Sequence, residues 1–181
     1  MTSDPRAVRH IVVMGASGAG KTTLAQGIVD ATGWDFLEGD ELHPPENVAK
    51  MTSGRPLTDE DRWPWLRSVG EWISEREAKG EPAVIACSAL RRPYRDLLRE
   101  GREHVEFLMI EVPAEELHRR LEERTDHYMK ASMLQSQLDT LEPLEADEPG
   151  VTLRSGGDEG QALADALVEL DLEGRDQAGR A

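Results

Sequence analysis

Short apolar runs alternate along the chain with longer segments in which apolar residues recur every three or four positions. The runs predict five buried β-strands, at residues 10–14, 35–37, 82–87, 105–112 and 151–154. The segments between them predict amphipathic helices, at 21–32, 45–51, 58–79, 91–100, 114–124, 129–141 and 159–170. Pro64 lies inside one of these helices, so we expect it to kink that helix or to delay its start.

The regular alternation of strand and helix indicates an α/β fold, a five-stranded parallel sheet with helices on both faces. The run at 82–87 is apolar throughout, which is typical of a central parallel strand. A chain of 181 residues suits a single domain with a normal core. Ligands of such sheets bind at the carboxyl ends of the strands, so the loops after the first three strands should converge on one crevice.

Directly after the first apolar run, residues 15–22 read Gly-Ala-Ser-Gly-Ala-Gly-Lys-Thr, the G-x-x-x-x-G-K-[ST] pattern of a P-loop. Its glycines let successive backbone N–H groups converge on a phosphate, and the next helix points its positive end at the same place. Lys21 can reach the β- and γ-phosphates, and the Thr22 hydroxyl can ligate Mg²⁺. The predicted nucleotide contacts are Gly15, Ala16, Ser17, Gly18, Ala19, Gly20, Lys21, Thr22 and Thr23.

Three classes of P-loop protein are candidates for this chain. A GTPase would carry an Asn-Lys-x-Asp motif that reads the base, and the sequence has none. A mechanical or AAA-type ATPase is usually larger and has an acid at the end of an apolar strand, whereas the third strand here ends in Ala86-Cys87-Ser88. A small-molecule kinase needs a phosphate cradle, Mg²⁺, a base, a substrate clamp and an arginine-bearing lid. The sequence offers candidates for all five and favours the kinase.

Asp40 is the candidate base, because it follows the second strand and can accept or orient the proton of an attacking hydroxyl. Glu38, two residues earlier, can hold Mg²⁺ through a water molecule. The alternative for Asp40 is a purely local role as the cap of the next turn.

Several basic residues flank the expected crevice, namely Lys50, Arg55, Arg62, Arg91, Arg92 and Arg95. Arg91 and Arg95 are one helical turn apart at the start of a helix that follows a central strand, where a planar guanidinium suits a substrate carboxylate. Arg120 and Arg124 end a helix just before Thr125, from where they can fold over ATP and stabilise the transferring phosphoryl group. The alternative for the flanking cations is that they are solvated surface residues. The alternative for Arg120 and Arg124 is that they only interact favourably with the helix dipole.

Composition limits the kinds of partner that the protein can bind. The net charge of −15 excludes nucleic acid, whose phosphate backbone requires a basic face. No apolar stretch approaches the length of a membrane span, and the N-terminus has no apolar signal region. The single cysteine, Cys87, excludes an internal disulfide and is expected to be a small buried hydrophobe. These features favour a protein of the cytoplasm.

Beyond the P-loop, the chain carries further distinctive segments, namely Gly39-Asp40-Glu41-Leu42-His43-Pro44, Asn47, Lys50-Met51, Gly54, Pro56-Leu57, Asp59-Glu60-Asp61-Arg62, Pro64-Trp65-Leu66, Cys87-Ser88-Ala89-Leu90, Tyr94-Arg95-Asp96, Arg120, Arg124, His127, Met129, Leu134, Ser136-Gln137, Leu141-Glu142 and Asp147-Glu148. In these segments the chain resembles one family, the small P-loop gluconokinases of the thermoresistant type. The resemblance implies a shikimate-kinase-like fold with strand order 2-3-1-4-5 and a helical lid, ATP with Mg²⁺, and a homodimer. Arg91 stands where the family often has Lys, and Thr125-Asp126 replaces a Lys-Gly-like pair.

The expected protein is a single P-loop kinase domain over residues 1–181, with a substrate-binding helical segment at about 41–80, a lid at about 119–145 and a disordered tail at 171–181. Its expected reaction is ATP-dependent phosphorylation of D-gluconate at the 6-hydroxyl, with Lys21, Asp40 and Arg124 as catalytic residues. The expected acceptor contacts are Asp40, His43, Lys50, Arg62, Ser88, Arg91, Arg95 and His127. A kinase for another small hydroxy acid, such as shikimate, and a non-catalytic nucleotide-binding regulator are the alternatives.

Overall fold

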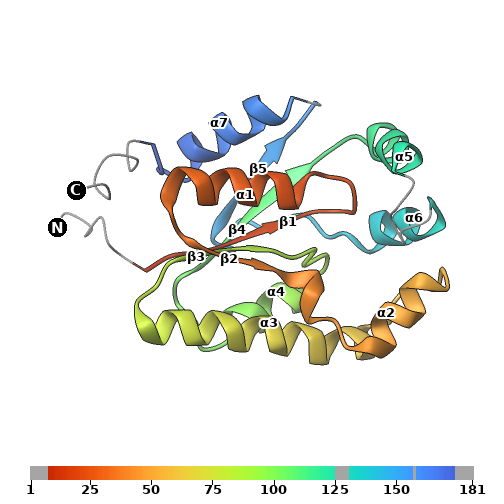
Figure 1. Ribbon diagram of the computed structural model, residues 1–181, viewed down its shortest axis with the longest axis horizontal. Helices are drawn as coiled ribbons and strands as arrows, with labels where there is room; N and C mark the ends of the chain where they lie inside the picture. The colour runs from red at the N-terminus through yellow and green to blue at the C-terminus, as the bar shows by residue number, and fades with distance from the viewer. Residues whose placement is uncertain (1–7, 125–130, 157, 174–181) are drawn as a thin grey trace.

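Five parallel strands form one sheet in the order β2-β3-β1-β4-β5 (Figure 1), which confirms the predicted topology. The computed structural model describes residues 8–124, 131–156 and 158–173. The strands are β1 (His10–Met14), β2 (Asp35–Glu38), β3 (Ala83–Ala86), β4 (Val105–Glu111) and β5 (Gly150–Arg154). Each lies within about two residues of the range that the apolar runs predict.

Helices cover both faces of the sheet and its carboxyl edge (Figure 1). One face carries α1 (Lys21–Thr32) and α7 (Glu159–Glu169), and the other carries α3 (Asp59–Lys79) and α4 (Arg92–Arg99). Beyond the carboxyl ends of the strands lie the 3₁₀ helix η1 (Gly39–Leu42) and the helices α2 (Pro45–Thr52), α5 (Ala114–Glu123) and α6 (Ala131–Thr140). In the described part of the chain, none of the helices has the length and apolar character needed to cross a bilayer.

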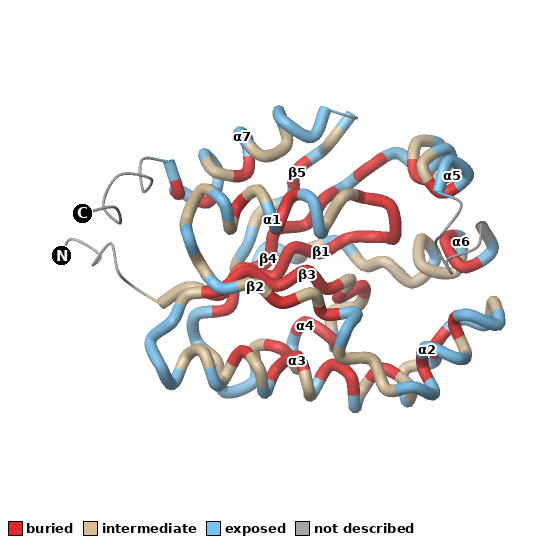
Figure 2. Tube along the Cα trace, in the orientation of Figure 1, coloured by how far each residue is buried: buried red, intermediate tan, exposed pale blue. Residues whose placement is uncertain are grey.

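Strand β1 shows why the sheet is stable in the middle of the molecule, where Figure 2 shows continuous burial. Ile11 and Val13 face the core beneath α1 and α7, whereas Val12 and Met14 face the core beneath α3 and α4. All four side chains have no solvent exposure. A parallel strand buried on both faces is apolar at nearly every position, and in β1 only the first residue, His10, is polar.

Helix α3 corrects one expectation, because it begins at Asp59 despite Pro64. Thr58 and Asp61 form a reciprocal cap: the Thr58 hydroxyl accepts from the Asp61 backbone N–H at 3.2 Å, and the Asp61 carboxylate accepts from the Thr58 N–H at 2.9 Å. This cap fixes the first turn, so Pro64 falls inside the helix, which continues to Lys79. The prediction of a later start is therefore wrong.

The C-terminal boundary also differs from the expectation. Leu172 packs into the core beside α1 and α7 with 2% exposure, and its N–H donates to Leu167 O at 2.8 Å. The chain is thus ordered beyond residue 171, where a disordered tail was expected to begin. Residues 174–181, the rest of that predicted tail, lie outside the described residues.

Two close backbone contacts bring the loops after β1, β2 and β3 together. Gly39, directly after β2, lies so near β3 that a β-carbon there would stand 2.6 Å from Ala86 O and 3.3 Å from Cys87 Cβ. The Gly15 N–H, at the start of the P-loop, donates to Ser88 O at 3.4 Å. The three loops therefore meet at one edge of the sheet, as predicted for a shared crevice.

Candidate active site

A cleft with a volume of about 110 Å³ lies at this edge of the sheet. Its walls come from the P-loop, the loops after β2 and β3, the α2–α3 segment, and helix α6 with the end of α5. Twelve of the predicted site residues line it, namely Ser17, Gly18, Gly20, Lys21, Thr22, Thr23, Glu38, Asp40, His43, Arg62, Ser88 and Arg124. A concave site on which several polar side chains converge is typical of sites for small molecules.

The P-loop occupies the floor of the cleft between β1 and α1. Gly20 caps α1 with φ 93°, a left-handed conformation that glycine adopts without strain. Lys21 Nζ donates to Ala16 O at 3.0 Å, so the ammonium is folded back over the loop. Burial lowers the pKa of Lys21, and the nearby Asp40 and Glu38 carboxylates partly offset that effect. The arrangement holds a cation where a phosphate would arrive.

Thr22 and Glu38 form a pair beside the P-loop, with the Thr22 hydroxyl donating to Glu38 Oε2 at 2.6 Å. Burial raises the pKa of Glu38, although the Thr22 hydrogen bond opposes the shift. A hydroxyl and a carboxylate supply the hard oxygen donors that Mg²⁺ prefers, and Mg²⁺ is usually held by one or two such groups plus substrate phosphates. Within 8–124, 131–156 and 158–173, no three His, Cys, Asp or Glu side chains gather into a metal-holding group.

Asp40 projects from η1 into the cleft. Its backbone oxygen accepts from the His43 N–H at 3.2 Å, which closes the turn without the side chain. The carboxylate is 51% exposed, and Oδ1 stands 3.8 Å from His43 Nε2. Because the side chain caps nothing in η1, the purely local role for Asp40 is not supported. Its oxygens face the same space as Lys21.

His43 and Trp65 build the wall next to Asp40. Their rings stack with centroids 4.0 Å apart and an interplanar angle of 20°. Trp65 Nε1 donates to Gly39 O at 2.7 Å, which ties α3 to the start of η1. Burial lowers the pKa of His43 to about 4, and the nearby Arg62 charge acts in the same direction, so the ring is neutral at neutral pH.

Arg62 is the one member of the six flanking cations that lines the cleft. It is 9% exposed, and its guanidinium donates to Tyr94 Oη at 2.8 Å. Tyr94 in turn hydrogen-bonds to the Asp59 carboxylate, so α3 and α4 together fix the guanidinium. A cation held in this way can bind an anionic group of a small substrate.

Lys50 and Arg91, two predicted acceptor contacts, are paired with acids outside the cleft. Lys50 Nζ lies 2.5 Å from Asp61 Oδ2, and an Arg91 guanidinium nitrogen lies 2.5 Å from Asp59 Oδ2. Neither side chain lines the cleft. Both cations pair with the acidic first turn of α3, so the structure does not bring them together with the other predicted acceptor contacts.

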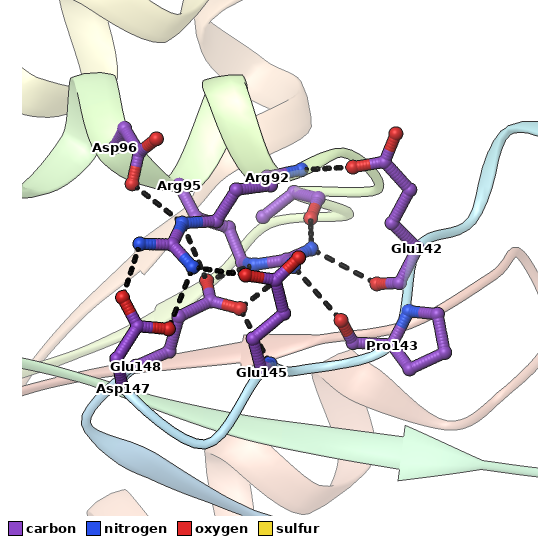
Figure 3. A network of polar contacts seen from close by, with 9 residues as sticks. Arg92, Arg95, Asp96, Glu142, Pro143, Glu145, Asp147 and Glu148 are labelled. Atoms are coloured by element: carbon purple, nitrogen blue, oxygen red, sulfur yellow. Dashed lines mark hydrogen bonds and ion pairs between the residues drawn. The ribbon is translucent and has the colours of Figure 1, made fainter.

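Arg95 is a second correction, and Figure 3 shows the cause. Its side chain has no exposure and makes an ion pair with buried Glu148, with Arg95 Nε 2.6 Å from Glu148 Oε1. The same guanidinium donates to three backbone carbonyls, those of Ala89, Glu142 and Pro143. Arg95 therefore fastens the segment after α6 to α4 and has no donor left over for a substrate.

Arg120, in the last turn of α5, and Arg124, directly after that helix, have different positions. Arg124 lines the cleft, as predicted. Arg120 does not line this cleft; its guanidinium donates to Gly18 O of the P-loop at 3.0 Å and to Glu116 Oε1 at 2.9 Å. Arg120 thus supports the phosphate cradle. His127, another predicted contact, lies outside the described residues.

Helix α6 adds cleft residues to which no role was assigned, namely Met133, Ser136 and Gln137. Gln137 Oε1 accepts from the Ser17 backbone N–H at 2.7 Å, so its side chain occupies a P-loop donor that could otherwise bind phosphate. Met133 also packs with Met51 and Leu57 in a small apolar cluster that joins α6 to the substrate-binding segment. These contacts depend on tertiary packing, which the sequence pattern of one helix cannot show.

Comparison with known proteins identifies close relatives. A family model described as "AAA domain" matches residues 11–144. The chain is 52% identical over 141 residues to a gluconokinase of Gluconobacter oxydans, a match that covers 78% of this chain and 79% of the relative. A solved sugar kinase from Janibacter shares 53% identity with a TM-score of 0.87, covering 92% and 96% of the two chains. A solved gluconokinase from Sinorhizobium meliloti shares 43% identity with a TM-score of 0.83, covering 92% and 93%.

Proposed function

The chain belongs to the gluconokinase family, and from that premise we propose how its cleft divides the phosphorylation of D-gluconate among its residues. The protein is a kinase that transfers phosphate from ATP to gluconate. The proposal assigns the donor side to the P-loop, the acceptor side to Asp40 and Arg62, and the transfer to the 6-hydroxyl of the sugar acid.

On the donor side, the P-loop amides and Lys21 bind the β- and γ-phosphates. Arg124 reaches the same cleft from the end of α5 and compensates charge on the transferring group. Thr22 and Glu38 would hold Mg²⁺, which when bound neutralises phosphate charge. These groups line one cleft, so ATP bound to them would be oriented for attack from the acceptor side.

On the acceptor side, Asp40 receives or orients the proton of the attacking hydroxyl. Arg62 binds the carboxylate of gluconate, and Ser88 and His43 contact its hydroxyls. The observation that supports this assignment is that the candidate cations differ in their partners. Lys50, Arg91 and Arg95 are engaged by acids, whereas Arg62 faces the cleft from a fixed position.

Besides the P-loop and the loops after β2 and β3, two further segments of the chain line the cleft. We propose that residues 41–80 form the acceptor-binding segment and that residues 119–145 form a lid over ATP, since cleft residues come from both. We also propose that the enzyme is a cytoplasmic homodimer, as the family resemblance and the single buried cysteine indicate. Light scattering on the purified chain tests the dimer.

Coupled measurement of ADP release tests the function. The panel contains gluconate, other aldonates, shikimate and nucleoside monophosphates, and gluconate should give the highest kcat/KM. Mass and NMR analysis of the product should place the phosphate on C6. A rate with shikimate above that with gluconate would contradict the assignment.

A second measurement isolates the carboxylate grip of Arg62. The wild-type enzyme should prefer gluconate strongly over the corresponding alditol, which lacks the carboxylate. In the Arg62→Ala variant this preference should shrink, because the cation that distinguishes the two acceptors is gone. An unchanged preference would show that another cation binds the carboxylate.

A further inference from the structure

Asn47, in the buried part of α2, makes two contacts with one nitrogen. Its side chain is 5% exposed. Asn47 Nδ2 donates to Asp61 O at 2.9 Å and lies 3.2 Å from His43 Nδ1. A carbonyl oxygen only accepts hydrogen bonds, so the nitrogen end of the amide is the end that faces Asp61. The orientation of the amide is therefore set independently of the histidine.

This orientation determines the proton on His43. An amide nitrogen only donates, and its two hydrogens serve the two contacts, so His43 Nδ1 must be the acceptor. A neutral imidazole carries one proton, which then resides on Nε2. Burial keeps the ring neutral at neutral pH, as its low pKa of about 4 indicates.

The other side of the ring points to the reacting groups. The stack on Trp65 prevents the ring from rotating out of its plane, and the side chain is 4% exposed. His43 Nε2 lies 3.8 Å from Asp40 Oδ1, and both residues line the cleft. This separation is too long for a direct hydrogen bond but leaves room for one oxygen to contact both groups.

We propose that Asn47 is a positioning residue that holds His43 as the Nε2–H tautomer, so that His43 donates to the acceptor hydroxyl whose proton Asp40 receives. The hydroxyl oxygen accepts from His43 Nε2–H while its own hydrogen points to Asp40. In this arrangement His43 cannot take the proton, because its free lone pair is engaged by Asn47. The catalytic part of this inference rests on the proposed function, but the tautomer does not.

Long-range ¹H–¹⁵N correlation spectra of the ¹⁵N-labelled full chain test the tautomer without any substrate. The His43→Gln variant identifies the His43 signals among the five histidines. The expected spectrum at pH 7 shows a protonated Nε2 and an unprotonated Nδ1. A proton on Nδ1 in the wild-type chain would overturn the proposal, whatever the enzyme phosphorylates.

Variants at position 47 test the role of the amide. Asn47→Asp replaces the donor with an acceptor, so the proton should move to Nδ1 and kcat with gluconate should fall about tenfold or more, with KM for ATP unchanged. Asn47→Ala leaves Nδ1 unpinned, so it should give mixed tautomers and a smaller loss. The matched control is Val48→Ala, at an exposed position of the same helix, which should keep the wild-type spectrum and rate.

The possible results distinguish the effect of Asn47 on the tautomer from the effect of the tautomer on catalysis. A loss of activity with the tautomer unchanged would give Asn47 a structural role only and overturn the proposal. A changed tautomer with wild-type kcat would overturn the catalytic part. If Asn47→Asp fails to fold, the wild-type spectrum and Asn47→Ala still decide the question.

Discussion

Asp40 illustrates how much of the site depends on single residues. Its carboxylate is half exposed, caps no helix and stands within electrostatic reach of Lys21. It was identified from its place after a strand, because a residue at that place must face the carboxyl edge of the sheet. Position in the fold was enough here to place the carboxylate in the cleft, where Oδ1 lies 3.8 Å from His43 Nε2.

Replacing Asp40 tests this assignment. Asp40→Asn keeps the size of the side chain but cannot receive a proton, so kcat should fall by ~10² or more while ATP binding stays near normal. Steady-state kinetics and ATP titration by calorimetry measure the two quantities. Turnover close to that of the wild type would show that the hydroxyl reacts without a base at this position.

The direction in which each basic side chain points could not be predicted from the sequence. Arg91 and Arg95 were paired because residues four apart share one face of a helix. The direction of that face depends on packing, and Arg95 faces the core, where Glu148 arrives from a segment more than fifty residues later. Arg62 could not be selected from the sequence either, because its distinction is that Tyr94 holds it at the cleft.

At the scale of elements, α4 and the segment from Glu142 to Glu148 act as one unit. The Glu142 carboxylate accepts from the Arg92 N–H at 2.7 Å at the start of α4, and the Arg92 guanidinium contacts Asp147 at 2.9 Å (Figure 3). Arg95 and Glu148 make the buried part of the same network. The network fixes the end of α6, whose residues line the cleft.

Removing one buried partner should destabilise the fold. Arg95→Met leaves the Glu148 carboxylate buried without its cation, at a cost of about 3–5 kcal/mol in the free energy of unfolding. The double variant Arg95→Met/Glu148→Leu should recover most of the loss, because no charge is then left unpaired. Urea unfolding measures both, and a double variant as unstable as the single one would show that the three carbonyl contacts of Arg95 dominate.

The elements themselves were largely predictable, for reasons that hold locally. Apolar runs placed all five strands, and the helix predicted over 58–79 matches α3. Of the two effects expected of Pro64, a kink or a later start, the later start does not occur, because the reciprocal cap at Thr58 fixes the first turn. The contact between Gln137 and Ser17 was not predictable, since it joins residues 120 positions apart.

At the scale of the whole molecule, stability should depend on pH through buried histidine. The pKa of His43 is about 4 in the folded chain and near its ordinary value of about 6.5 in the unfolded chain. Between these values the unfolded state binds more protons, so the free energy of unfolding decreases as the pH falls from about 6.5 to 4.

Comparison with His43→Gln isolates this contribution, because Gln does not titrate and the buried His10 is common to both chains. Between pH 7 and pH 5 the wild type should lose about 1–2 kcal/mol more stability than the variant. Denaturant unfolding at the two pH values gives the difference. Parallel losses in the two chains would show that His43 is already protonated or is solvated in the folded state.

The absence of a side chain at Gly39 lets the loop that carries Asp40 lie close to the loop after β3, and this contact sets the spacing of the two reactants. One methyl group there would meet Ala86 O and push the loop that carries Asp40 away from the loop of Ser88, which touches the P-loop at Gly15. Displacements near 1 Å can cost ~10² in rate, so Gly39→Ala should lower kcat steeply while ATP still binds. Gly156→Ala, where a methyl group meets nothing within 4 Å, should keep the wild-type rate in the same assay. The distance between the acceptor and the transferred phosphate would then depend on the absence of a β-carbon at position 39.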